Sequence, residues 1–205
     1  MIKKITIILF IILCGIACSG HSGTIFLNNN YDHKLIYKSV LCDSKKSFPQ
    51  MILIPYFNQA SQIVPNCDTY PVHQTALALF VFYHQWLENF GDQNMEIRGM
   101  LEKVMIEWDT EKRIGKKGFN LEGERFKDRP ILGVVKSPSM IWVWQGYNHK
   151  ISESALFHEL VHLAIRAKNG KHGDPDHEGH KYRGWTKRHS HMIIESKQML
   201  RAFGL

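Results

Sequence analysis

The chain has 205 residues, of which 44% are hydrophobic, so it is long enough to bury the core of one domain. Its formal charge is +7, and the loss of Lys3 and Lys4 with a leader would lower this by two, to about +5. The basic residues are scattered, which favours a solvated surface and, for an exported protein, argues against nucleic acid as a partner.

The N-terminus has the pattern of an export signal. Basic residues precede an apolar run over 5–12, which is too short to span a membrane and suits a secretory signal. The run leads to Ala17-Cys18, which resembles a bacterial lipobox, although Gly15 stands where that motif usually has leucine. This resemblance implies lipidation of Cys18 after cleavage, and simple cleavage near Ala17 is the alternative.

We therefore expect a signal peptide over 1–17, a flexible tether over 18–34 and one domain over 35–205, anchored by lipid to a membrane of the bacterial cell envelope. Loss of the signal and lipidation would leave two cysteines, Cys42 and Cys67. In an oxidising compartment, these two are predicted to form a disulfide across a proline-containing loop. The segment around them is expected to be irregular with short strands.

Two further helices are predicted from periodicity and capping signals. Residues 76–90 carry apolar and aromatic side chains without a breaker, and Gly91 follows them. Thr186 is a suitable N-cap for a helix over 187–202. Aromatic residues of the first helix are assigned to the core rather than to a cofactor site.

Three short segments are predicted to be strands. Residues 104–108 are assigned to a strand rather than to the end of a helix, and 131–135 and 140–144 are two apolar runs joined by Ser137-Pro138-Ser139.

The strongest functional signal is HELVH at 158–162. Side chains four residues apart share one face of a helix, so His158 and His162 can bind one metal ion. Glu159 would sit beside that metal, where it can take a proton from bound water. The apolar neighbours of the histidines argue against the alternative of a solvent-facing helix, because buried imidazoles need partners. Ser152 or Ser154 is expected to cap the start of the helix, and Asn169-Gly170 is expected to end it.

HELVH matches the signature of zincin metallopeptidases, and the stretch from His158 to the last helix resembles SprT-like and related minimal zincins and predicted zincin-like bacterial lipoproteins. The resemblance implies an α+β fold in which a small mixed sheet packs on a scaffold helix, here 76–90, on the HExxH helix and on a C-terminal helix. It also implies that 140–144 is an edge strand along which an extended substrate pairs.

A catalytic zinc needs a third protein ligand. The metzincin pattern is excluded because Ile165 and Lys168 stand where it requires glycine and histidine. The resemblance implies a histidine in the following loop, where spacing favours His177 and an adjacent glycine favours His180. We choose His177 and retain His180. A thermolysin-like glutamate would have to be Glu178 or Glu195, but Met199 stands where that pattern requires Asp after Glu195. His172 is another candidate, and His189 and His191 on the last helix are less well placed.

We therefore expect an exported zinc metallopeptidase that binds one Zn2+ per chain through His158, His162 and His177 and cleaves protein or peptide substrates. Zinc-activated water would be the nucleophile and Glu159 the general base. The alternatives are a non-catalytic envelope protein with structural zinc and a cell-wall amidase that uses the same metal site. The first is disfavoured because a structural zinc site does not need Glu159.

Overall fold

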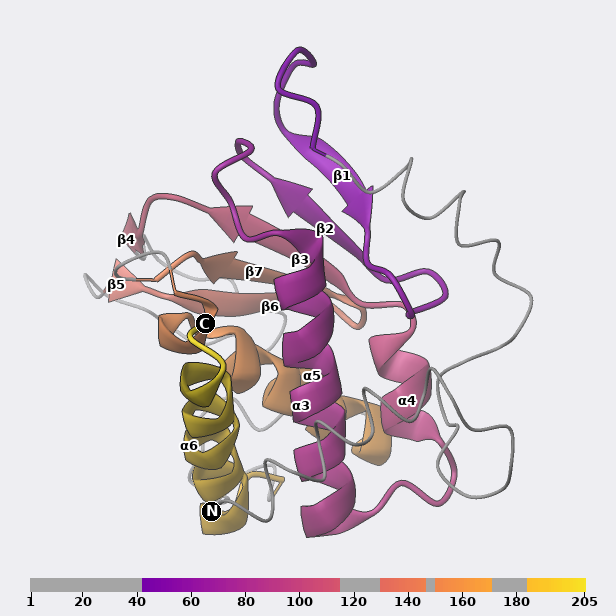
Figure 1. Ribbon diagram of the computed structural model, residues 1–205. Helices are drawn as coiled ribbons and strands as arrows, with labels where there is room; N and C mark the ends of the chain where they lie inside the picture. The colour runs from indigo at the N-terminus through magenta and orange to yellow at the C-terminus, as the bar shows by residue number, and fades with distance from the viewer. Residues whose placement is uncertain (1–41, 115–129, 147–149, 171–183) are drawn as a thin grey trace, which may run out of the picture.

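A five-stranded mixed sheet forms one layer of the molecule, and the long helices lie below it in Figure 1. The computed structural model describes residues 42–114, 130–146, 150–170 and 184–205. The predicted α+β class is confirmed. The predicted signal peptide and tether lie outside the described residues. Within the described ranges, no helix is long and apolar enough to cross a membrane.

The strand order in the main sheet is β1-β2-β3-β7-β6. The three inner strands run parallel to one another, whereas each edge strand is antiparallel to its neighbour. A separate two-stranded sheet pairs β4 with β5. The strands are β1 (Gln50–Leu53), β2 (Ser61–Val64), β3 (Met105–Asp109), β4 (Arg113–Ile114), β5 (Pro130–Ile131), β6 (Gly133–Ser137) and β7 (Met140–Trp144).

The prediction that 140–144 is the edge strand is wrong. β7 pairs with β3 on one side and with β6 on the other, so β6 is the edge. Chain order does not fix strand order, because a tight hairpin can place either of its strands on the outside. A signal for the inner position was present in the sequence. β7 is an unbroken apolar run, which is typical of a strand covered on both faces, and its residues from Ile141 to Trp144 are buried.

The predicted helices are confirmed, with small changes at their ends. The helix predicted over 76–90 begins earlier, at Val72, and Gly91 with a φ of 70° follows it. The C-terminal helix begins after Thr186, as predicted. A short helix precedes β3, so the stretch for which helix and strand were weighed as alternatives contains both, with the strand at 105–109. The helical segments are α3 (Val72–Phe90), α4 (Glu96–Leu101), the 3-10 helix η2 (Ile151–Glu153), α5 (Leu156–Asn169) and α6 (Lys187–Ala202).

Aromatic and aliphatic contacts hold α5 between the sheet and the other helices. Phe157 on α5 stacks against Phe82 on α3, with ring centroids 6.4 Å apart and an interplanar angle of 12°. Leu156, Leu160 and Val161 are fully buried. Each such side chain contributes about 2 kcal/mol by leaving water. The helix that carries HELVH is therefore part of the core.

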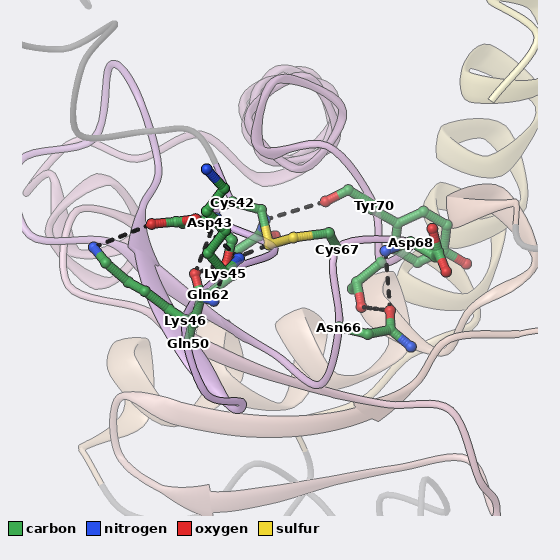
Figure 2. The surroundings of a disulfide bond; sticks show 11 residues. Cys42, Asp43, Lys45, Lys46, Gln50, Gln62, Asn66, Cys67, Asp68 and Tyr70 are labelled. Carbon is green, nitrogen blue, oxygen red and sulfur yellow. Dashed lines mark hydrogen bonds and ion pairs between the residues drawn. A yellow bond between two sulfur atoms is a disulfide. The ribbon is translucent and has the colours of Figure 1, made fainter.

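The predicted disulfide between Cys42 and Cys67 is present, with their Cα atoms 5.6 Å apart (Figure 2). It joins the first described residue to the loop after β2. Gln50, at the start of β1, supports the same corner: its Nε2 donates to the Asp43 carbonyl at 2.6 Å, and its Oε1 accepts the Asp43 N–H at 3.2 Å. A closed loop of this size stabilises a fold by about 3 kcal/mol in the chain-entropy account.

A buried polar network links the sheet to α3. Gln62 on β2 is 1% exposed, and its Oε1 accepts hydrogen bonds from Thr75 Oγ1 at 2.6 Å and from Trp108 Nε1 at 3.0 Å. Its Nε2 donates to the Tyr70 carbonyl at 3.2 Å, and the Tyr70 hydroxyl donates to the Gln145 carbonyl just after β7. The network thus ties β2, β3, α3 and the end of β7 together.

Replacing Gln62 with leucine should lower the free energy of unfolding by about 2–4 kcal/mol, because two buried donors and one carbonyl lose their partner. Urea unfolding of the purified variant measures this loss. Gln85→Leu is the matched control. Gln85 is equally buried, its Oε1 has no partner among the described residues, and its Nε2 donates to Glu88 Oε2 at 3.1 Å and to Met199 Sδ at 3.2 Å, so a smaller loss than for Gln62 is expected. Equal losses in the two variants would contradict a special role for the Gln62 network.

Candidate active site

The residues at the two ends of α5 determine where this helix begins and ends. The predicted serine cap is wrong: Ala155 is the N-cap of α5 and makes no side-chain cap hydrogen bond. Ser154, one residue earlier, accepts the Leu156 N–H with its Oγ at 3.2 Å. Ser152 has another role, because its hydroxyl donates to the Leu205 carbonyl at the C-terminus. Gly170 ends the helix in the left-handed conformation with a φ of 68°, and its N–H donates to the Arg166 carbonyl at 2.8 Å.

The two motif histidines point their Nε2 atoms at one place. The His158 Nε2 and His162 Nε2 atoms are 3.2 Å apart, and the ring planes meet at 75°. His162 is 7% exposed, whereas His158 is half-buried. Two nitrogen ligands of one tetrahedral zinc lie roughly 3.3–3.4 Å apart, so the observed separation fits a shared metal. The same separation also suits an N–H···N hydrogen bond between neutral imidazoles.

Glu159 is buried, with 5% of its surface exposed, and packs against the edge strand. A β-carbon built on Gly133 of β6 would lie only 2.5 Å from Glu159 Oε1 and 2.8 Å from Glu159 Cδ. The carboxylate therefore occupies the space in which another residue at 133 would place its side chain. This contact joins the motif helix directly to the edge of the sheet.

The edge strand presents unpaired backbone groups beside this carboxylate. The Trp144 N–H donates to the Leu132 carbonyl at 2.8 Å, which makes Leu132 and Trp144 a hydrogen-bonded pair. Antiparallel pairs alternate, so the N–H and C=O groups of Gly133 and Val135 point away from β7. Within the part of the chain that the structure describes, these outward groups have no partner.

Trp185 covers the histidine pair, and sequence reasoning gave it no role. Its ring centroid lies 5.1 Å from that of His158 and 4.8 Å from that of His162. Its Nε1 donates to Ser190 Oγ on α6 at 2.9 Å, which fixes the ring to the C-terminal helix. A lone tryptophan between a loop and a helix carries no sequence pattern that would mark it as a neighbour of the site.

The predicted third ligand, His177, and its alternative, His180, lie outside the described residues. In the described ranges, no group of three or more His, Cys, Asp or Glu side chains that could hold a metal is found. Trp185 nevertheless places the end of the loop against the histidine pair. His180 precedes Trp185 by five positions and His177 by eight. An extended chain spans about 3.3–3.6 Å per residue, so length permits either ligand.

The two histidines of α6 have structural contacts that explain them. His189 Nδ1 accepts the Thr186 N–H at 3.0 Å in a capping box, and its ring stacks on Phe90 with centroids 4.2 Å apart. His191 is exposed and lies 3.6 Å from the carboxylate of Glu195. These contacts favour a structural role for both.

Comparison with known proteins gives no family: no protein-family model, no curated protein and no solved structure matches this chain. The functional assignment therefore depends on the geometry of the site and on the sequence motif.

The His189 side chain should make stability depend on pH. Burial, with a smaller contribution from the charge of Lys168, lowers its pKa from 6.5 to about 4. Above pH 6.5 the imidazole is neutral in both states; below that pH the unfolded chain takes up the proton first, so stability falls until about pH 4. We expect a loss of about 2 kcal/mol between pH 7 and pH 5 from this residue.

Urea unfolding at both pH values measures this loss, and His189→Gln is the control. Glutamine at this position can keep the capping box but does not titrate. The variant should lose less stability than the wild type over the same interval, with the difference close to 2 kcal/mol by the same linkage. Identical pH dependence in the two proteins would show that His189 is not responsible for the loss of stability.

Proposed function

We propose that the protein is a zinc-dependent metallopeptidase with a zincin-like fold. The observation that carries this proposal is that three features lie next to one another. The His158 and His162 Nε2 atoms are 3.2 Å apart, and the carboxylate of Glu159, the residue after His158, is buried. That carboxylate packs against the edge strand β6. Two metal ligands, a base and a peptide-binding edge are the parts that metal-assisted peptide hydrolysis needs.

The fold agrees with the zincin resemblance in part. A mixed sheet precedes the HExxH helix α5, as the resemblance implies, but the strand directly before that helix, β7, is an inner strand and β6 is the edge. The helix predicted as the scaffold, α3, packs against α5 through Phe82 and Phe157. The substrate-pairing role that we had expected of 140–144 is transferred to β6, because in the described sheet β6 is an edge strand and β7 is not.

The donor set fits zinc. His158 and His162 would hold the ion, and a histidine of the following loop, His177 or His180, would complete the site. Zinc, when bound, supplies a Lewis acid that polarises a carbonyl and lowers the pKa of water. Trp185 keeps the rings of both motif histidines in place through its contacts with them.

Glu159 is the general base in this proposal. Its carboxylate accepts a proton from the water that attacks the peptide carbonyl, and it passes that proton to the departing amine as the C–N bond breaks. Gly133 and Val135 bind the substrate in extended form through their outward N–H and C=O groups. Pairing of backbone with backbone selects for a peptide and gives little preference for its sequence.

The disulfide supports the proposed location outside the cytoplasm, because such bonds persist mainly in oxidising compartments. We propose attachment to a bacterial envelope membrane through lipid on Cys18, as the lipobox resemblance implies. The alternative of a purely structural zinc protein gives no reason for a buried glutamate against the open edge. A cell-wall amidase would use the same groups on a different substrate.

Elemental analysis of the purified protein should find one zinc per chain. His158→Ala and His162→Ala should each lose the metal, and only one of His177→Ala and His180→Ala should do so, which would identify the third ligand. His191→Ala is the matched control and should keep the zinc, because that side chain is exposed on α6. A wild-type protein that contains no zinc and takes up none when zinc is added would end the metallopeptidase proposal.

Glu159→Gln should retain one zinc and lose hydrolysis by about 100-fold or more, because removal of a general base costs 10²–10⁴-fold in rate. Cleavage of a quenched fluorescent peptide library, with cell-wall fragments assayed in parallel, distinguishes a peptidase from an amidase. Glu153→Gln is the control: it loses a partly exposed ion pair with Arg201 and should keep full activity. Full activity in Glu159→Gln would exclude this glutamate as the base.

A further inference from the structure

Gly133 is a glycine for reasons of space and not of backbone conformation. Its φ lies outside the left-handed range, so other residues could adopt the same backbone. The obstacle is the Glu159 side chain: an added β-carbon would meet Oε1 at 2.5 Å, Cγ at 2.6 Å and Cδ at 2.8 Å. Contacts this short do not occur between real β-carbons and their neighbours, so one group would have to move.

The group that would move is the carboxylate. α5 is fixed by fully buried residues such as Leu160 and Val161, and β6 is fixed by its pairing with β7. Glu159 has a flexible side chain, although with 5% exposure it has little open space to enter. A methyl group at position 133 would therefore displace the carboxylate and leave the two backbones where they are.

The same residue also belongs to the open edge. The Gly133 N–H and C=O groups point outward along the sheet, whereas its missing β-carbon would point toward α5. A strand added at this edge would lie about 4.8 Å from β6. Gly133 therefore brings the proposed base and the proposed substrate-binding backbone together at one residue.

We propose that Gly133 is a positioning residue: its lack of a side chain creates the slot that holds the Glu159 carboxylate against the substrate-binding edge. The substrate residue that pairs with Gly133 then lies next to the base, which fixes where along the peptide hydrolysis takes place. This inference rests on the proposed function.

A double-mutant cycle tests the contact without any assay of activity. Gly133→Ala should lower the Tm by about 5 °C in the wild-type background, the size expected of modest overpacking in a chain of this length. In the Glu159→Ala background, where the three clashing atoms are absent, the same substitution should change the Tm by less than about 2 °C. If Gly133→Ala alone does not fold, restored folding in the double variant supports the contact. Equal shifts in both backgrounds overturn it.

Gly99→Ala is the matched control for the substitution itself. Gly99 lies inside α4, and an added β-carbon there meets nothing within 4 Å. Its Tm should stay level or rise slightly, because alanine favours a helix by about 1 kcal/mol over glycine.

Kinetics with a cleaved peptide test the positioning role. Gly133→Ala should keep one zinc per chain, with a KM close to that of the wild type because the backbone edge is intact, and should lower kcat roughly 100-fold because the base is displaced. An unchanged kcat in Gly133→Ala, with hydrolysis abolished in Glu159→Gln, overturns the positioning role and leaves the proposed function standing. Absence of zinc uptake and of hydrolysis in the wild type overturns both.

Discussion

The structure depends on the burial of α5, a helix that has to be apolar enough to join the core while carrying two imidazoles and a carboxylate. Leu156, Leu160 and Val161 meet the first requirement by packing between the sheet and the other helices. Polar groups buried on the same helix are costly unless they are partnered. His158 and His162 converge on one place under Trp185, and Glu159 fits against a bare glycine.

The arrangement places the proposed chemistry at the β6 edge, one of the two edges of the described sheet. The opposite edge, β1, is connected through its hairpin partner β2 to the disulfide and to the Gln62 network, which stabilise that end of the sheet. At the β6 edge, by contrast, the backbone of Gly133 and Val135 is left for another strand. Rigid support on one side and open backbone on the other is what a peptide-binding site on a sheet requires.

Features with local causes were predictable from the sequence. The end of α3, the extent of α6, the end of α5 at Gly170 and the pairing of Cys42 with Cys67 follow from periodicity, capping residues and cysteine arithmetic. All of these act over short stretches of chain or on very few candidates. The convergence of His158 and His162 was equally predictable, because a four-residue spacing fixes it within one helix. The third ligand stays a prediction.

The sequence by itself determined that one helix would present two histidines and a glutamate, because helical geometry alone brings those positions to the same region. Only the tertiary structure decided that β6 and not β7 forms the edge, since strand order depends on which neighbours pair and not on chain order. It likewise decided that Gly133 meets Glu159 and that Trp185 covers the histidines. These contacts join residues separated by more than twenty positions. A local sequence pattern therefore cannot predict which of these side chains pack against each other.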